Sequence, residues 1–195
     1  IIINSILLLL ILTNLAQLAS SRLRVCIQMI AFQGISLSVL PFVLMHEKLV
    51  IHSIVLALIA FVLRGIIIPW VLLKVLGQTG ASREVEPYIG FASSALIGVC
   101  VLAFCFHFSG KLALPSENAS SDVVPVALFC IFAGLFMIVT RRKALSQVAG
   151  YLVIENGIYA FGVAVAASNS WLIEIGVMLD ILIAILIMVI TMFHI

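Results

Sequence analysis

Charged residues are scarce in this sequence: only 9% of its 195 residues are Asp, Glu, Lys or Arg, whereas 65% are hydrophobic. A soluble domain usually carries about 25% charged residues, so the shortage, with a mean hydropathy of +1.37, excludes that class. The net charge of +2 is too small to indicate a nucleic-acid partner. We therefore interpret the chain as a polytopic membrane protein, with the lipid bilayer as its main environment.

Cysteine is also scarce and is poorly spaced for chemistry. The four cysteines lie in apolar runs without CxxC spacing: Cys26, Cys100, Cys105 and Cys130. This pattern excludes a disulfide framework and a zinc site, and we expect all four to be buried small hydrophobic residues. The sequence has no Gly-rich phosphate loop, no HisGluxxHis motif and no nucleophile accompanied by a base. We therefore expect no catalytic residue, no metal site and no cofactor in this chain.

Long apolar runs are what the sequence does contain. A spanning helix needs about 20 mostly apolar residues, and the chain can be divided into seven such runs. They lie at about 1–18, 25–45, 49–76, 88–108 and 122–140, with two more in 141–192 that meet near 167–170. The first run has no basic residue before it and no cleavage site after it, so we interpret it as a spanning helix and not a signal peptide. The predicted fold class is all-α with seven transmembrane helices.

Basic residues are distributed unevenly among the predicted loops. The loops after helices 1, 3 and 5 hold seven Lys or Arg residues, and those after helices 2, 4 and 6 hold only Lys48 and Lys111. Since basic loops stay on the cytoplasmic side during insertion, we expect the N-terminus outside and the C-terminus in the cytoplasm.

The order of features in the first three helices is repeated in the last three. In each set a basic turn leads to a helix with a polar residue near its middle, and then to a helix with a charged residue near its middle. These residues are Gln33 and Arg64 in the first set, and Glu155, followed by Asn156, and Asp180 in the second. The repeat predicts three parts: an N-terminal three-helix set at 1–76, a linking helix with its loops at 77–121, and a C-terminal three-helix set at 122–195.

Two carboxylates are predicted to lie deep in the membrane. Glu155 is twelve residues past Lys143, or about 18 Å at about 1.5 Å of rise per residue. Asp180 is nine residues past Trp171, or about 13 Å from the other face. An ionised group there costs at least about 2.5–3.5 kcal/mol, so each must be neutral, paired or in contact with water. We interpret the two acids as a proton relay, and the alternative is that they are buried polar residues that pack between helices.

Arg64 is the third charge inside a predicted helix. Gly65 and Pro69 follow it, and a kink there could expose carbonyl groups to the guanidinium. Its partner could be Glu155, Asp180 or an acid of another subunit, and a fixed structural ion pair would explain it equally well.

Several uncharged polar residues could support the charged ones. Gln33, Asn156 and Tyr159 could extend a hydrogen-bonded chain of water along the path. Joining one helix to another is the alternative role, and for most such residues we favour it.

The C-terminal helices resemble a known family. The stretch RRKALSQVAGYLVIENGIYA at 141–160 resembles the second helix of the NuoK subunit of respiratory complex I, in which a basic turn precedes an apolar helix carrying a glutamate and then a small polar residue. The stretch VMLDILIA at 177–184 resembles the third helix of NuoK, and the same region is similar to MrpC of Mrp antiporters. Over its whole length, with GlnGly at 33–34 and IIIPW at 66–70, the chain resembles the HyfE family, the hydrogenase-4 component E of formate hydrogenlyase.

The resemblance implies a non-catalytic subunit in the membrane arm of a proton- or sodium-translocating nickel–iron hydrogenase or complex I-like assembly, in the inner membrane of a prokaryote. Its partners would be antiporter-like subunits and the membrane anchor of a hydrogenase module. Glu155 and Asp180 would be the acids of a lateral proton path, with Asp180 in the place of the usual glutamate. Gln33 and Arg64 stand where the N-terminal copy would need acids, so only one copy could relay protons. The alternatives are a free-standing small ion or solute transporter, and a structural spacer in an Mrp-type antiporter complex.

Overall fold

The computed structural model describes residues 2–44, 58–59, 61–79, 87–111 and 122–165, and the regular elements of this part of the chain are helices. The helices are α1 (Ile2–Ala19), α2 (Leu23–Leu44), a π-helical turn η1 (Leu63–Ile67), α4 (Ile68–Thr79), α5 (Phe91–Ser109), α6 (Val123–Thr140) and α7 (Ala144–Val165). The all-α prediction is therefore confirmed for the described residues.

Four described helices are long and apolar enough to cross a membrane: α1, residues Leu23–Leu40 of α2, α5 and α6. The bounds of these helices agree to within about three residues with the predicted apolar runs. The agreement is expected because an apolar run in lipid must be helical throughout to satisfy its backbone hydrogen bonds. Helix α7, with 22 residues, is also long enough to cross a membrane, and it carries Gln147, Glu155 and Asn156. The run expected near 171–192 lies outside the described residues, so the count of seven stays a prediction.

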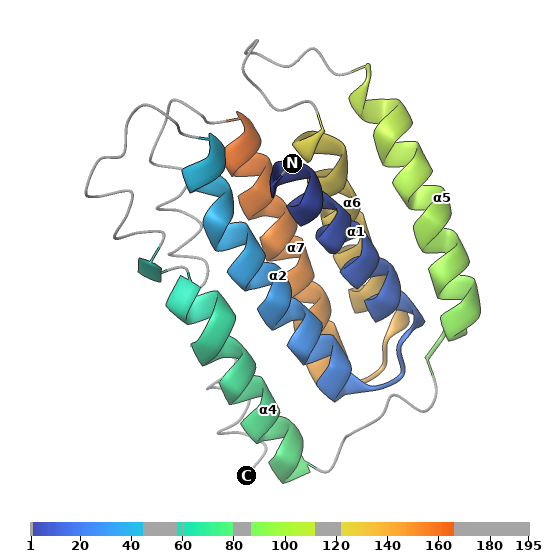
Figure 1. Ribbon diagram of the computed structural model, residues 1–195. Helices are drawn as coiled ribbons and strands as arrows, with labels where there is room; N and C mark the ends of the chain where they lie inside the picture. The colour runs from blue at the N-terminus through green and yellow to red at the C-terminus, as the bar shows by residue number, and fades with distance from the viewer. Residues whose placement is uncertain (1, 45–57, 60, 80–86, 112–121, 166–195) are drawn as a thin grey trace.

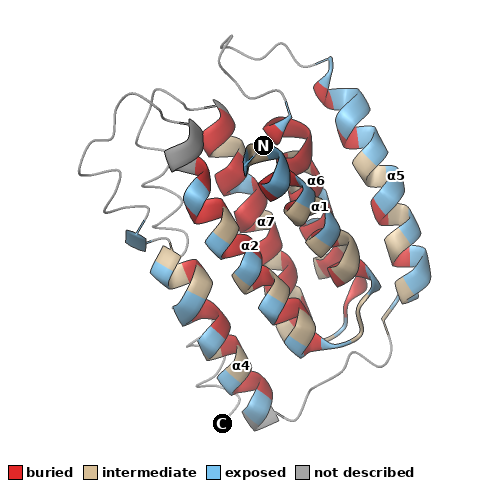
Figure 2. Cartoon of the chain, in the orientation of Figure 1, coloured by how far each residue is buried: buried red, intermediate tan, exposed pale blue. Residues whose placement is uncertain are grey.

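In the described part of the chain, α7 lies between α2 and α6 (Figure 1). Its most extensive contact is with α6, and it also packs on α2. Helix α1 lies against α2, α5 and α6, whereas η1 and α4 lie against α2. Figure 2 shows the result: α7 is mostly buried and α5 mostly exposed. The polar residues Glu155 and Asn156 of α7 are therefore buried inside the bundle. The composition of α7 alone did not predict this burial.

Helix α5 contacts only α1 and α6 to any extent among the described elements, and few of its side chains are buried. Cys100 lies on its exposed face, whereas Cys26, Cys105 and Cys130 are buried. The prediction that all four cysteines are buried is thus wrong for Cys100, because the sequence does not reveal that this helix is covered on one side only.

Glycines allow α6 and α7 to approach closely. A Cβ atom on Gly134 of α6 would lie 2.5 Å from the carbonyl oxygen of Gly150 of α7. One on Gly157 of α7 would lie 2.8 Å from the carbonyl oxygen of Ala127 of α6. Small residues at helix contacts in membranes permit this approach and strengthen van der Waals packing.

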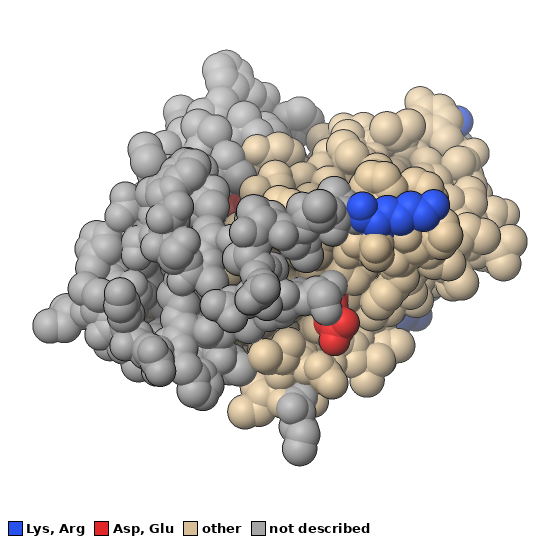
Figure 3. All heavy atoms as spheres, turned by 90° about the horizontal axis from the view of Figure 1, so that it is seen from above, with Lys and Arg blue, Asp and Glu red and all other residues tan. Residues whose placement is uncertain are grey.

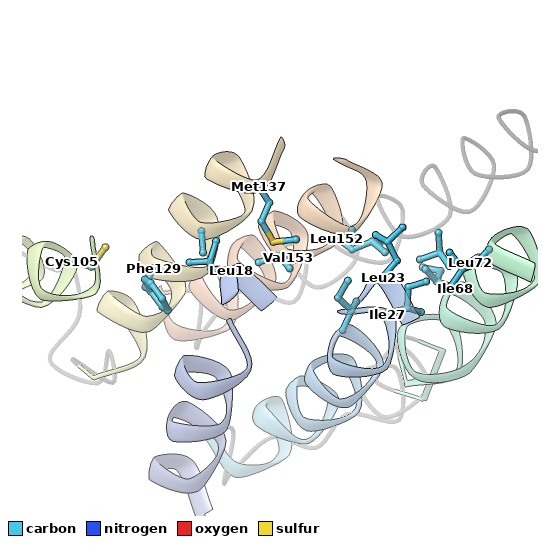
Figure 4. Close-up of a cluster of buried hydrophobic side chains, with 14 residues drawn as sticks. Leu18, Leu23, Ile27, Ile68, Leu72, Cys105, Phe129, Met137, Leu152 and Val153 are labelled. Atoms are coloured by element: carbon cyan, nitrogen blue, oxygen red, sulfur yellow. The ribbon is translucent and has the colours of Figure 1, made fainter. Parts of the chain in front are cut away.

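The buried side chains form two apolar clusters. Figure 4 shows the first, in which Leu18 of α1, Phe129 of α6 and Val153 of α7 lie among side chains from six helices. Large apolar side chains such as Leu8, Leu96 and Val139 are also exposed on the outside, which suits a lipid environment because acyl chains are as apolar as leucine. Seen from above, charged atoms occupy only small areas of the described surface (Figure 3).

Candidate functional site: a buried ion pair joined to a polar network

Arg64 lies in the π-helical turn η1, immediately before α4. The turn approaches α2 closely: a Cβ atom on Gly34 would lie 2.8 Å from the Cβ atom of Arg64. Gly65 lies in the same turn, and a Cβ atom on it would lie 2.8 Å from Cγ1 of Ile35 on α2. Gly65 lies within this π-helical turn and Pro69 just after it, and π-helical turns are frequent at functional sites.

Arg64 forms an ion pair with Glu155 of α7. Its Nη2 atom lies 3.2 Å from Oε1 of Glu155, and the two side chains are 4% and 3% exposed. The guanidinium also lies over the ring of Tyr159, with Cζ 4.1 Å from the ring centroid. Tyr159 follows Glu155 by one helical turn, so α7 presents both residues to Arg64 on one face.

The sequence left three acids open as the partner of Arg64, and in the described part of the chain Arg64 is paired with Glu155. The two residues are 91 positions apart in the sequence. Asp180 lies outside the described residues, and so does its expected position at the depth of Glu155. Since the removal of one partner from a buried pair leaves an uncompensated charge, each of the two residues depends on the other.

A hydrogen-bonded network adjoins the ion pair and crosses three helices. Asn156, next to Glu155, donates from Nδ2 to Oε1 of Gln33 on α2 over 3.2 Å. Gln33 in turn donates from Nε2 to Oγ1 of Thr13 on α1 over 2.8 Å. Gln33 and Asn156 therefore join helices, as we expected for most such residues, and their role beside water stays a prediction.

Replacing Gln33 with Leu should destabilise the protein by about 1 kcal/mol, because hydrogen bonds between membrane helices average about 0.6 kcal/mol and reach about 1.7 kcal/mol. The free energy of unfolding in mixed micelles measures the change. Gln28 on the same helix is exposed, so Gln28→Leu is the matched control and should change little. Equal effects of the two substitutions would contradict the network.

Further buried polar residues, not selected from the sequence, lie on α1 and at the α6–α7 turn. Asn14 donates from Nδ2 to the carbonyl oxygen of Leu10 over 2.8 Å and approaches Sγ of Cys130 at 3.0 Å. Gln17 is fully buried. Because Thr13, Asn14 and Gln17 are spaced by three and four residues, they share one face of α1. This spacing is visible in the sequence and could have identified them as a polar face of the helix.

Arg141 belongs to the basic turn that we expected to form a loop, yet it is only 2% exposed. It donates from Nη2 to the carbonyl oxygen of Leu18 over 2.8 Å and lies over the ring of Phe91, 4.5 Å from its centroid. Arg142, its neighbour, is exposed and lies over Tyr88. Of this adjacent pair, therefore, Arg141 joins α6 to the end of α1, whereas Arg142 stays at the surface.

These features define a class: a polytopic membrane protein whose described helices enclose an arginine–glutamate pair. The chain is similar to several known proteins, of which two are described. The chain is 29% identical over 168 residues to the uncharacterized protein Rv0085 of Mycobacterium tuberculosis, covering 85% of this chain and 76% of that protein. It is 26% identical over 130 residues to hydrogenase-4 component E of Escherichia coli, covering 67% of this chain and 60% of that protein.

No protein-family profile matches the chain, and no solved structure matches it. The similarity to hydrogenase-4 component E is distant, and the chain spans about 60% of the length of that relative. It agrees with the resemblance that the sequence motifs indicated.

Proposed function

We propose that the chain is a membrane-arm subunit of a proton- or sodium-translocating nickel–iron hydrogenase or related complex I-like assembly. In this proposal it holds no catalytic centre and contributes Glu155 and Asp180 to a lateral ion path. Arg64 is the counter-charge of Glu155, and Gln33, Asn156 and Tyr159 are the supporting polar residues. The distant similarity to hydrogenase-4 component E supports the kind of assembly.

The observation that carries the proposal is the buried contact between Arg64 and Glu155 at 3.2 Å. Charged residues inside membrane segments are costly, and they commonly mark ion or proton pathways. The pair also adjoins a hydrogen-bonded polar network. Here Glu155 adjoins Asn156, whose side chain begins the network across α2 and α1.

The pair can respond to a single proton. Arginine stays protonated in proteins, so Arg64 attracts Glu155 only while that carboxylate is ionised. A proton that binds the Glu155 carboxylate cancels its charge and weakens its attraction to the guanidinium. Arg64 is then stabilised by a different acid, and in our proposal this acid is Asp180 or a carboxylate of an adjoining subunit.

The test compares ion translocation with hydrogenase turnover in membrane vesicles that contain the assembled complex. We expect the double variant Arg64→Met with Glu155→Gln to lose coupled translocation while hydrogen turnover continues. The double substitution is chosen because it removes both charges and leaves no unpaired one. Asp180→Asn should have the same effect.

The conservative variant Glu155→Asp keeps a titratable acid and should retain part of the coupling. This control separates the loss of the acid from a general disturbance of α7. If the neutral double variant translocated ions as the wild type does, the proton-path role would be wrong and a structural spacer would be supported. Translocation by the purified chain alone would favour the free-standing transporter.

A further inference from the structure

The α1–α2 and α6–α7 turns lie close together at one end of the bundle (Figure 1). A small pocket there is lined by residues of both turns and their helices. Its cavity volume is about 10 Å³, which is about the minimum needed for one water molecule and too little for a phosphate group. Its lining includes residues of both turns and their helices, among them Gln17, Ser20, Ser21, Arg141 and Ser146. A bound water needs at least two polar partners, and the side-chain amide of Gln17 can supply both, one as a donor and one as an acceptor.

Gln17 is the residue that makes this pocket unusual. Its side chain is 0% exposed, and neither of its amide atoms has a hydrogen-bond partner among the described residues. A buried amide without a partner is costly, and such groups in native proteins commonly bond to ordered water. The pocket that Gln17 lines supplies the space for that water.

We propose that the Gln17 pocket is a hydration site that admits water at the basic end of the bundle, and that it begins a polar route toward Glu155. The hydration site stands independently of the proposed function. The polar route rests on the proposed function, because a route to Glu155 matters only if Glu155 exchanges protons.

The route follows the polar face of α1. Asn14 and Thr13 lie three and four residues before Gln17, or about 4.5–6 Å along the helix. Oδ1 of Asn14 also has no hydrogen-bond partner among the described residues, so it offers water a further acceptor. Thr13 bonds to Gln33, which bonds to Asn156 beside Glu155. Polar groups thus extend from the pocket to the ion pair without crossing a purely apolar layer of α1.

Two oxidisable sulfur atoms provide a direct test, because Met137 and Cys26 line the pocket and are only 2% and 4% exposed. Brief X-ray radiolysis produces hydroxyl radicals from bound water, which oxidise neighbouring sulfur atoms. We expect Met137 to be oxidised in the full-length protein in lipid nanodiscs, and the yield to fall about fivefold when Ala149→Leu fills the pocket. Mass spectrometry of the Met137 peptide measures the yield.

Two further variants separate hydration from a disturbed fold. Ala19 is exposed on α1 near the pocket, so Ala19→Leu adds the same atoms outside it and should leave Met137 oxidation unchanged. Gln17→Leu removes the polar partner without enlarging a side chain, and it should lower the yield as Ala149→Leu does. Negligible oxidation of Met137 in the wild type, or an equal yield in all variants, would overturn the hydration site.

The route is tested separately, by the coupling assay on the assembled complex. Gln17→Leu should reduce coupled translocation while hydrogen turnover continues, and full coupling in this variant would overturn the route. Loss of coupling in the Glu155 variants together with a dry Met137 would refute only the inference about the pocket. Oxidation of Met137 with full coupling in the Glu155 variants would refute the proposed function and the route, and leave the hydration site standing.

Discussion

Arg64→Met should lower the free energy of unfolding by about 3–5 kcal/mol, the usual cost of breaking a buried ion pair by removing one partner. The Glu155 carboxylate is 3% exposed and would keep its negative charge away from water. Loss of the guanidinium also removes its contact with the Tyr159 ring. Glu155→Gln should be similarly destabilising, because it leaves Arg64 charged beside an amide.

The double variant Arg64→Met with Glu155→Gln should recover most of this loss, to within about 1–2 kcal/mol of the wild type, since neither charge is then unpaired. The double-mutant cycle, measured by reversible unfolding in mixed micelles, gives the coupling energy directly. Additive effects of the two single substitutions would show that the pair does not contribute as a unit.

Arg142 provides the matched control for this measurement. It is exposed, with its guanidinium 4.5 Å from the centroid of the Tyr88 ring. Exposed contacts of this kind contribute about 0.5–1 kcal/mol, so Arg142→Met should cost no more than that. A loss as large as that of Arg64→Met would indicate a general effect of removing arginine and not of breaking a buried pair.

Gly134→Val should prevent α6 and α7 from packing as they do. Even a single Cβ atom at this position would lie 2.5 Å from the carbonyl oxygen of Gly150 and 2.8 Å from the backbone nitrogen of Ile154. Backbone atoms cannot move aside as the end of a flexible side chain can. We expect Gly134→Ala to cost about 1–3 kcal/mol, as overpacking does, and valine to cost more because it adds two further methyl groups.

Since the α6–α7 contact also holds Glu155 inside the bundle, Gly134→Val should lower the yield of folded protein in the membrane. Limited proteolysis and size-exclusion chromatography in detergent measure this yield. Gly77 is an exposed helical glycine of α4 with no atom within 4 Å of its ideal Cβ position. Gly77→Ala should therefore be neutral or stabilising by up to about 1 kcal/mol through helix propensity. Similar losses at both positions would contradict the close approach.

Helix α7 is about as apolar in composition as α2, and what distinguishes it is where its polar residues lie. It carries Glu155 and Asn156, and it packs against α6 and α2 with most of its described residues buried. Its polar residues are tolerated there because Glu155 is paired and Asn156 is hydrogen-bonded. A helix with these residues facing lipid would expose them to a medium that offers no partner.

The sequence by itself determined the class of the protein and most helix bounds. Apolar runs at 1–18, 88–108 and 122–140 became α1, α5 and α6 with shifts of at most three residues. These bounds are predictable because the thickness of the bilayer sets the length of a helix locally. The sequence also identified Glu155 and Arg64 as exceptional, since a charge in an apolar run is visible without any partner.

Only the tertiary structure decided which of these residues meet. Glu155 is 91 positions from Arg64, and Asn156 is 123 positions from Gln33, so no local pattern could join them. The same is true of Arg141. The sequence places Arg141 and Arg142 in the same basic turn without distinguishing them, but only Arg141 of the two is buried. Pairing and burial depend on which helix faces lie against each other, and the glycines at 34, 134 and 150 permit three of the close contacts involved.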